Sequence, residues 1–180
     1  MASMYFIALV APADINQQAL KWKKFMQEHF GCTVALRSPA HITLIPPFWM
    51  DEGLEKDLEI TIAEFSKGQK EFKIDLVGFS AFKPKVIYVA VSQNEFLQVL
   101  HSQLQNFMTS SAKYPVKIED RSFHPHVTIA ARDLHKKDFY TAWEMFKEKK
   151  YEAAWNINGI SLLKHNKKNW DVIFTSQFQK

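Results

Sequence analysis

Two short stretches decide how this sequence is interpreted: SPAHITLIPPF at residues 38–48 and FHPHVTIAAR at residues 123–132. Each contains a histidine followed two positions later by a threonine, His41 with Thr43 and His126 with Thr128. Residues i and i+2 of a β-strand lie on the same face. Each stretch therefore predicts a half-buried strand that presents an imidazole beside a hydroxyl, with apolar residues on the opposite face.

The two stretches belong to a longer pattern of internal similarity. The histidines are 85 positions apart, residues 72–79 resemble 155–162 at a spacing of 83, and residues 88–90 resemble 172–174 at 84. The alternative is the loosely similar spacing that any α+β chain shows. A nearly constant offset across three features favours a duplication, with halves of approximately 1–91 and 86–180. An offset this long predicts two lobes and not an array of short repeats.

The spacing of apolar residues along the rest of the chain alternates between helical and strand periods, which predicts an α+β fold. We expect one bilobal domain over residues 1–180, in which each lobe is an antiparallel sheet backed by two helices and the active site lies in the cleft between the lobes. The expected helices cover residues 15–30, 54–65, 92–107 and 139–146. The expected strands cover residues 5–10, 41–45, 72–82, 86–91, 126–130, 155–163 and 170–175.

Local signals place several element boundaries. Gly31 is expected to end the first helix, and Pro46-Pro47 to break the strand that starts at His41. Ser92 with Glu95 three positions later has the spacing of a capping box, which predicts the start of the third helix. That helix is expected to turn one apolar face inward, made of Phe96, Leu100, Leu104 and Phe107.

Composition excludes several classes of protein. The chain has 180 residues, 47% apolar content, a net charge of +4, five glycines and a single cysteine. The absence of an apolar run of about 20 residues predicts no membrane span, and we expect no signal peptide. Cys32 cannot form an internal disulfide, which indicates a reducing cytoplasm. Without a glycine-rich loop, nucleotide-cradling motifs are not expected. The basic balance permits a nucleic acid partner, and no obligate protein partner is expected.

The paired motifs predict chemistry at phosphorus. If the lobes are related by pseudo-twofold symmetry, both imidazoles and both hydroxyls face one cleft. His41 and His126 are then the catalytic pair, since one imidazole can take a proton from the attacking oxygen while the other gives a proton to the leaving oxygen. Thr43 and Thr128 are expected to hold the nonbridging phosphate oxygens. A module that binds a nucleotide or phosphate in the same cleft without turnover is the alternative.

The two stretches resemble the signatures of the 2H phosphoesterase superfamily. Its members include the RNA 2′,3′-cyclic phosphodiesterases, historically called 2′-5′ RNA ligases, and the bacterial YjcG-like proteins. The resemblance implies that His41 and His126 are catalytic and that Thr43 and Thr128 are the hydroxyl residues. It implies metal-independent hydrolysis of a cyclic phosphodiester on RNA or a small nucleotide, together with the reverse 2′-5′ ligation. In the second motif the arginine of the RNA enzymes is replaced by Ala131, and Arg132 comes one position later.

Further residues are candidates for the cleft, each with a structural alternative. Arg37 and Arg121 precede their motifs and are either phosphate contacts or solvated loop charges. Arg132 shares a strand face with His126 and is expected at the cleft rim. The remaining candidates are Phe48 and Trp49, which either stack on a base or pack over the lobe edge, and His124, which we expect in a loop near the cleft.

A metal site is the remaining alternative for these histidines. His124 and His126 have the spacing of two zinc ligands on one strand face, and His41 could supply a third. No cysteine cluster or nearby carboxylate completes such a site in the sequence. We therefore expect neither a metal nor another cofactor.

Overall fold

A computed structural model describes residues 1–110, 112–119 and 121–180 of the chain. Its helices are α1 (Ala13–Phe30), α2 (Glu55–Lys67), α3 (Glu95–Ser110) and α4 (Lys136–Phe146), with short 3-10 helices η1 (Val34–Arg37) and η2 (Glu52–Leu54). Its strands are β1 (Ala2–Val10), β2 (His41–Asp51), β3 (Phe72–Phe82), β4 (Val86–Val91), β5 (His126–Ala130), β6 (Glu152–Ile157), β7 (Gly159–His165) and β8 (Trp170–Gln177).

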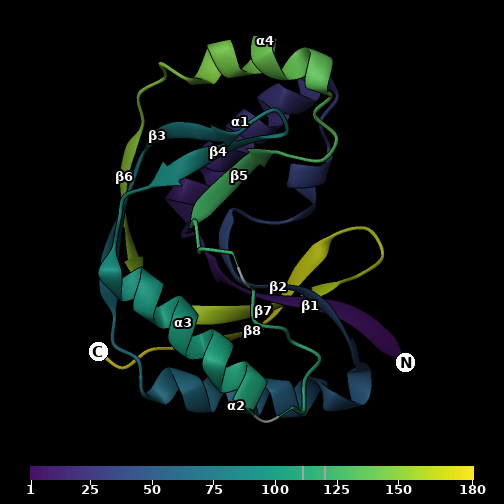
Figure 1. The fold of residues 1–180 in the computed structure, drawn as a ribbon, viewed down its shortest axis with the longest axis vertical. Coiled ribbons are helices and arrows are strands. Elements are labelled where there is room, and N and C mark those ends of the chain that lie inside the picture. The colour runs from purple at the N-terminus through teal and green to yellow at the C-terminus, as the bar shows by residue number, and fades with distance from the viewer. Residues whose placement is uncertain (111, 120) are drawn as a thin grey trace.

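The strands form two four-stranded antiparallel sheets, which confirms the predicted α+β class and its two lobes. Sheet 1 has the order β2-β1-β7-β8, and sheet 2 has the order β5-β4-β3-β6. In Figure 1, α1 and α4 lie with sheet 2 in the upper half, and α2 and α3 lie with sheet 1 in the lower half. Sheet 1 combines strands from both ends of the sequence, and sheet 2 combines strands from residues 72–157. Strands of both predicted halves therefore contribute to each lobe.

Helix α1 shows how local sequence defines an element. Its buried residues Ile15, Ala19 and Met26 recur at helical spacing, as an amphipathic helix requires. Gly31 follows the last helical residue with φ of 70°, and its N–H bonds to the Gln27 carbonyl. A left-handed residue after a helix favours glycine because it has no Cβ. The predicted end at Gly31 is therefore confirmed.

The predicted break at Pro46-Pro47 is wrong. Strand β2 continues through both prolines to Asp51, because it is an edge strand whose outer N–H groups need no partner. Tyr5 pairs with Phe48 and Ile7 with Ile45, so the two prolines stand opposite a single β1 residue in a bulge.

The predicted start of the third helix is also wrong. Asn94, not Ser92, caps α3, since its side-chain oxygen accepts a hydrogen bond of 3.0 Å from the Leu97 N–H. The buried face of α3 contains Leu97, Leu100, Leu104, Gln105 and Met108. Of the predicted face, Phe96 and Phe107 are instead exposed, because the helix is rotated so that Leu97 and Met108 face the core.

The predicted strand over residues 155–163 is in fact two strands. Asn158 separates β6, which pairs with β3 in sheet 2, from β7, which pairs with β1 in sheet 1. The chain therefore passes from one lobe to the other between these two strands. Local apolar spacing does not distinguish this crossover from a single long strand.

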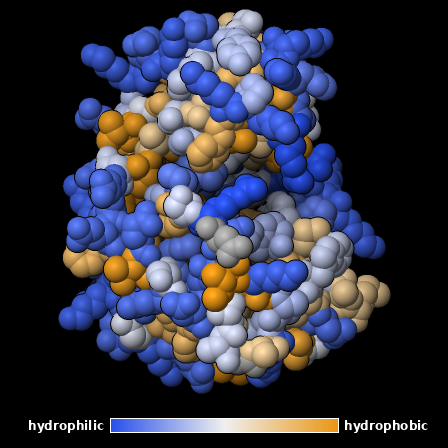
Figure 2. All heavy atoms as spheres, in the orientation of Figure 1, coloured by the Kyte–Doolittle hydropathy of each residue, from blue (hydrophilic) through white to orange (hydrophobic). Residues whose placement is uncertain are grey.

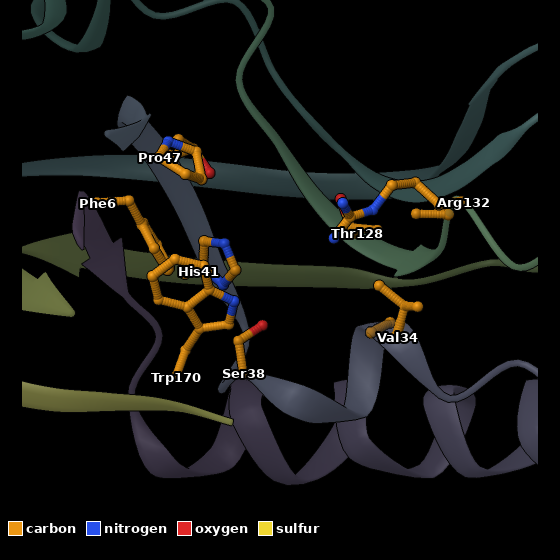
Figure 3. Close-up of a pocket in the computed structure, with 11 residues that line it drawn as sticks. Phe6, Val34, Ser38, His41, Pro47, Thr128, Arg132 and Trp170 are labelled. Atoms are coloured by element: carbon orange, nitrogen blue, oxygen red, sulfur yellow. The ribbon is translucent and has the colours of Figure 1, made fainter. Parts of the chain in front are cut away.

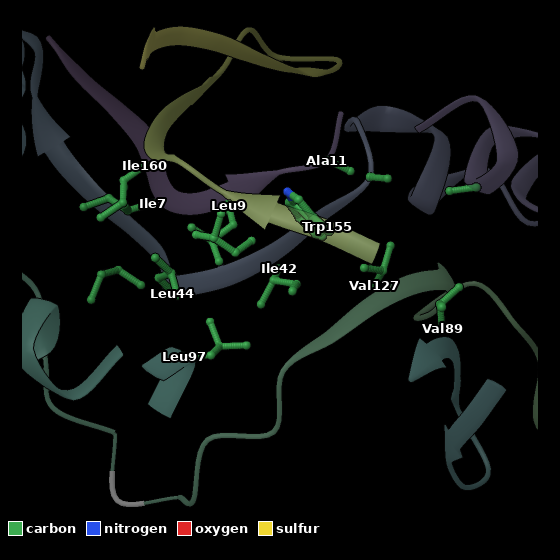
Figure 4. Packing of buried hydrophobic residues seen from close by; sticks show 14 of the residues in the cluster. Ile7, Leu9, Ala11, Ile42, Leu44, Val89, Leu97, Val127, Trp155 and Ile160 are labelled. Carbon is green, nitrogen blue, oxygen red and sulfur yellow. The ribbon is translucent and has the colours of Figure 1, made fainter. Parts of the chain in front are cut away.

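One hydrophobic cluster runs through both lobes. Figure 4 shows residues from both sheets packed together, including Leu9 and Ile42 from sheet 1 and Val127 from sheet 2, with Leu97 of α3 nearby. This shared core fixes the two sheets relative to each other and with them the strands that carry the two motifs. Among the described residues, no helix is long and apolar enough to cross a membrane.

Candidate active site

The two motif strands face each other across the lobes. β2 and β5 are edge strands of different sheets, and they contact each other. In sheet 1, Thr43 pairs with Ala8 of β1, and in sheet 2, Thr128 pairs with Tyr88 of β4. Since side chains alternate along a strand, each histidine shares a face with its threonine, while Ile42 and its equivalent in β5 are buried on the other face.

Both imidazoles are held by the same local hydrogen bond. The Nδ1 atom of His41 lies 2.7 Å from the Pro39 carbonyl oxygen, and that of His126 lies 2.7 Å from the His124 carbonyl oxygen. A carbonyl oxygen can only accept, so Nδ1 carries the hydrogen in each ring. The Nε2 atom of each neutral ring therefore has a free lone pair for proton transfer.

A small pocket of about 190 Å³ contains most of the predicted phosphate site. His41, Thr43, Thr128 and Arg132 all line it. Figure 3 shows His41, Ser38 and Trp170 on one side of the pocket and Thr128, Arg132 and Val34 on the other. One imidazole, the two threonine hydroxyls and one guanidinium therefore border a space in which a phosphoryl group would meet donors from both lobes.

The second histidine lines an adjoining, larger pocket of about 670 Å³. His126 shares it with Arg121 and His124, and Thr43 lines both pockets. Thr43 and Pro47 thus lie at the boundary where the space beside His41 meets the space beside His126. In Figure 2, hydrophilic residues border a hollow near the middle of the molecule.

Burial keeps both imidazoles uncharged near neutral pH. Burial is the main cause that lowers the pKa of His41 to about 4; the hydrogen bond to the Pro39 carbonyl opposes it, and the nearby Lys23 and His126 add to it. Burial likewise lowers the pKa of His126, against its hydrogen bond to the His124 carbonyl. A neutral imidazole can accept a proton, and a bound phosphate anion would raise the pKa of either ring toward the protonated form.

A buried lysine from α1 supports the loop that holds His41. Lys23 is 3% exposed, and its Nζ donates a hydrogen bond of 3.0 Å to the Ser38 carbonyl oxygen. Asn16, also from α1, accepts a hydrogen bond of 2.8 Å from the Ala40 N–H. These two contacts bracket Pro39, whose carbonyl oxygen fixes the His41 ring.

Aromatic residues that the sequence analysis did not assign to the site flank both imidazoles. The Phe6 ring lies 4.9 Å from His41 and 4.7 Å from Trp170, measured between ring centroids. On the other side, the rings of Phe82 and Tyr88 lie 5.1 and 5.0 Å from His126. Strand alternation could have identified Phe6 from the sequence, because Phe6 lies on the opposite face of β1 from the core residues Tyr5 and Ile7.

The remaining predicted cleft residues divide among several places. Arg132 lines the small pocket, and Arg121 and His124 line the large one. Arg37 lies outside both, in a separate pocket of about 370 Å³. The structure therefore does not bring Arg37 and Arg121 together.

The two aromatic candidates next to the prolines of β2 line neither pocket that contains a motif histidine. Phe48 is buried and packs near the Tyr5 ring, at 6.3 Å between centroids. Trp49 is 61% exposed and lines a groove with Pro115 that contains neither histidine. Within the described part of the chain, no group of three or more His, Cys, Asp or Glu side chains is placed to hold a metal ion.

Comparison with known proteins agrees with this architecture. A protein from Geobacillus thermodenitrificans that carries the name phosphoesterase is 28% identical over 161 residues, covering 88% of this chain and 86% of that protein. The E. coli LigT structure complexed with 3′-AMP covers 100% of both chains, with a TM-score of 0.72 and 17% identity. The TT0787 protein of Thermus thermophilus covers 97% of both chains, with a TM-score of 0.66 and 16% identity. The model of the 2′-5′ RNA ligase superfamily matches residues 11–169, and the chain belongs to this superfamily.

Proposed function

We propose that the protein is a metal-independent phosphoesterase that hydrolyses a cyclic phosphodiester, the 2′,3′-cyclic phosphate of RNA or of a nucleotide. The observation that carries the proposal is the matched pair of imidazoles. Hydrogen bonds to the Pro39 and His124 carbonyls leave both Nε2 atoms available in adjoining pockets that share Thr43. A binding module needs no such acid–base pair, whereas in-line displacement at phosphorus needs one group to remove a proton and another to supply one.

The reaction requires only water and the two histidines. A water oxygen attacks phosphorus while the Nε2 atom of one neutral histidine takes the water proton. The bond from phosphorus to one ribose oxygen breaks, and the Nε2–H of the other, protonated histidine gives that oxygen a proton. The product is a phosphomonoester. The Thr43 and Thr128 hydroxyls and the Arg132 guanidinium supply donors to the nonbridging oxygens, where negative charge increases in the transition state.

The relatives support this substrate class. LigT of E. coli is named as a complex with 3′-AMP, which is a nucleoside monophosphate and so belongs to the chemical class of the proposed product. Two Geobacillus relatives, at 28% identity over 161 and 145 residues, carry the name phosphoesterase. Both names agree with a reaction that releases a phosphomonoester.

The test is hydrolysis of a nucleoside 2′,3′-cyclic phosphate in the presence of EDTA. The wild-type protein is expected to turn the substrate over, and His41→Ala or His126→Ala to reduce kcat by about 10²–10⁴-fold. The double variant should lose far less than the product of the two single losses, because the pair acts as a unit. His135→Ala serves as the control, since His135 is exposed and lines neither pocket.

Three results would contradict the proposal. Near-full activity in a folded double variant would place the chemistry elsewhere in the molecule. Tight nucleotide binding without turnover, across cyclic and oligonucleotide substrates, would identify a binding module. Activity that is abolished by EDTA and restored by zinc would indicate a metallohydrolase.

A further inference from the structure

A second, strongly basic pocket of about 370 Å³ lies outside the acid–base site. Three of its lining side chains are cations, namely Arg37 from η1 and Lys167 and Lys168 from the hairpin between β7 and β8. Its other lining residues are Gln27, Thr33, Leu36 and Asn169, so no acidic side chain of the described residues lines it. The lining side chains therefore carry a net positive charge, which favours an anionic ligand.

The basic pocket and the small pocket are lined by consecutive residues on two walls. On the first wall, Ser38 lines the small pocket and the preceding residue, Arg37, lines the basic pocket. On the second wall, Trp170 lines the small pocket and the preceding residue, Asn169, lines the basic pocket. Consecutive Cα atoms are about 3.8 Å apart, so on both walls the backbone that carries the basic pocket directly adjoins the backbone that carries the small pocket.

Side-chain hydrogen bonds to the backbone hold the first wall in place. The Asp133 carboxylate accepts bonds from the N–H groups of Thr33, at 2.5 Å, and Val34, at 2.8 Å. These bonds tie the start of η1 to the segment that follows β5. Arg37 therefore extends from a backbone that is fixed relative to the Thr128 side of the small pocket.

The hairpin wall is held in the same way. The Asn166 side-chain oxygen accepts bonds from the N–H groups of Lys168, at 3.0 Å, and Asn169, at 2.7 Å. The amide nitrogen of Asn166 donates to Asp171, which is the carboxylate of this hairpin. The two lysines are thus carried by an ordered turn, and their side chains are exposed at its tip.

We propose that Arg37, Lys167 and Lys168 form a second phosphate subsite. It binds the 5′-phosphate of the same nucleotide whose cyclic phosphate lies beside His41. The inference rests on the proposed function, which places the cyclic phosphate in the small pocket, and it adds a preference among substrates. The 5′-phosphate can be a terminal monoester or the diester that joins the nucleotide to the preceding one, because both present the same anionic oxygens to the cations.

The experiment compares kcat/KM for three substrates in EDTA: a nucleoside 2′,3′-cyclic phosphate, its 5′-phosphorylated form, and a dinucleotide ending in the same cyclic phosphate. Two variants remove the subsite from opposite walls, Arg37→Gln and the pair Lys167→Gln with Lys168→Gln. Each is expected to lower kcat/KM roughly 10-fold or more for the substrates with a 5′-phosphate, as the loss of charged hydrogen bonds implies, and to leave the unphosphorylated substrate nearly unchanged.

The matched control is Lys149→Gln with Lys150→Gln. This pair removes the same net charge from exposed positions after α4 and lines none of the three pockets. The salt dependence of kcat/KM is a second measurement, since salt screens an exposed ionic contact and should therefore weaken the preference for a 5′-phosphate in the wild type only. If the subsite variants lower kcat/KM for the dinucleotide alone, the ligand of the subsite is the internucleotide diester. If they lower it equally for the dinucleotide and the 5′-phosphorylated nucleotide, the subsite accepts any 5′-phosphate.

Failure of the subsite can be distinguished from failure of the proposed function. If the wild type hydrolyses all three substrates and the subsite variants slow them equally or not at all, the subsite proposal is overturned while the hydrolase stands. If none is hydrolysed, calorimetry with mono- and dinucleotides ending in a 3′-phosphate decides the question. If the subsite variants bind the dinucleotide more weakly than the wild type does but bind the mononucleotide equally well, the subsite is supported. If they bind both as the wild type does, the subsite is refuted.

Discussion

At the scale of single residues, Lys23 is the least expected feature of the site. A lysine that is 3% exposed and has a carbonyl as its hydrogen-bond partner, with no carboxylate paired to it among the described residues, is costly to bury as a cation. Burial accordingly lowers the pKa of Lys23 to about 8, which leaves it mostly charged at pH 7. Its charge in turn lowers the pKa of His41. Lys23 thus positions the Ser38 carbonyl and favours a neutral His41.

Replacing Lys23 tests this positioning role. Lys23→Met removes a cation near His41, so the pKa of His41 should rise by about half a unit to one unit, and the acidic limb of the pH–rate profile should move up with it. NMR titration of the His41 ring measures the shift directly. The other charged or titratable groups that line the two pockets stay unchanged in this variant, namely His101, Glu119, Arg121, His124, His126 and Arg132.

Two variants separate charge from packing at this position. Lys23→Arg keeps the charge and should keep the wild-type His41 titration, and Lys24→Met removes a charge from the exposed neighbouring position. A Lys23→Met protein with reduced activity and an unmoved His41 titration would reduce Lys23 to a purely structural role.

The threonines permit a second prediction at the same scale. Thr43→Val and Thr128→Val each delete one donor to the phosphoryl oxygens while nearly keeping the side-chain shape. We expect each to reduce kcat roughly 10- to 100-fold, the value of one hydrogen bond to a charged group. Thr43→Ser and Thr128→Ser keep the hydroxyl and should restore most of the rate. A full loss in the serine variants, with near-wild-type rates in the valine variants, would show that the methyl group, not the hydroxyl, matters.

At the scale of elements, the local pattern predicted where helices and strands lie better than where they end. Alternation around His41 and His126 correctly predicted both motif strands, because side-chain period alone reports a half-buried strand. Continuation of β2 through Pro46-Pro47 was unpredictable, since it depends on β2 being the edge of its sheet. Edge position is set by pairing with β1, which local sequence does not contain.

The start of α3 gives a prediction at this scale. Asn94 accepts the hydrogen bond from Leu97, so Asn94→Ala should lower the free energy of unfolding by about 1 kcal/mol, the usual value of a helix N-cap. Ser92→Ala is the matched control, because Ser92 occupies the position that the capping-box pattern indicated but does not cap the helix. Urea unfolding followed by circular dichroism measures both. A larger loss for Ser92→Ala than for Asn94→Ala would reverse the assignment of the cap.

At the scale of the whole molecule, the near-constant offset between motifs predicted two lobes, but not which strands build each one. Sheet 1 joins β1 and β2 to β7 and β8, which lie more than 100 positions further along the chain. This pairing brings Trp170 next to Phe6 and hence next to His41, and no local signal connects residues so far apart. The two histidine–threonine pairs could therefore be predicted from sequence, while their aromatic surroundings and the basic pocket required the fold.

The half-buried histidines also make the stability of the whole protein depend on pH. The pKa of His41 falls from an ordinary 6.5 to about 4 on folding, and burial lowers the pKa values of His101 and His126 as well. Between about pH 4 and pH 6.5 the unfolded chain binds more protons than the folded protein. The free energy of unfolding therefore rises with pH across this window, and stability is lost as the pH falls toward 4. For His41 alone the loss at pH 4.5 is on the order of 2–3 kcal/mol.

Substitution of His41 should remove its share of this acid sensitivity. The free energy of urea unfolding should fall between pH 7.5 and pH 4.5 in both proteins. We expect this loss to be smaller in His41→Gln than in the wild type, by roughly 2–3 kcal/mol. Carboxylates that titrate near the lower end of the window are common to both proteins and cancel in the comparison. His135→Gln, at an exposed position, should behave as the wild type does. Equal losses of unfolding free energy in the wild type and His41→Gln would mean that the His41 ring gains its proton as readily in the folded protein as in the unfolded chain. That result would contradict the neutral imidazole on which the proposed proton transfer depends.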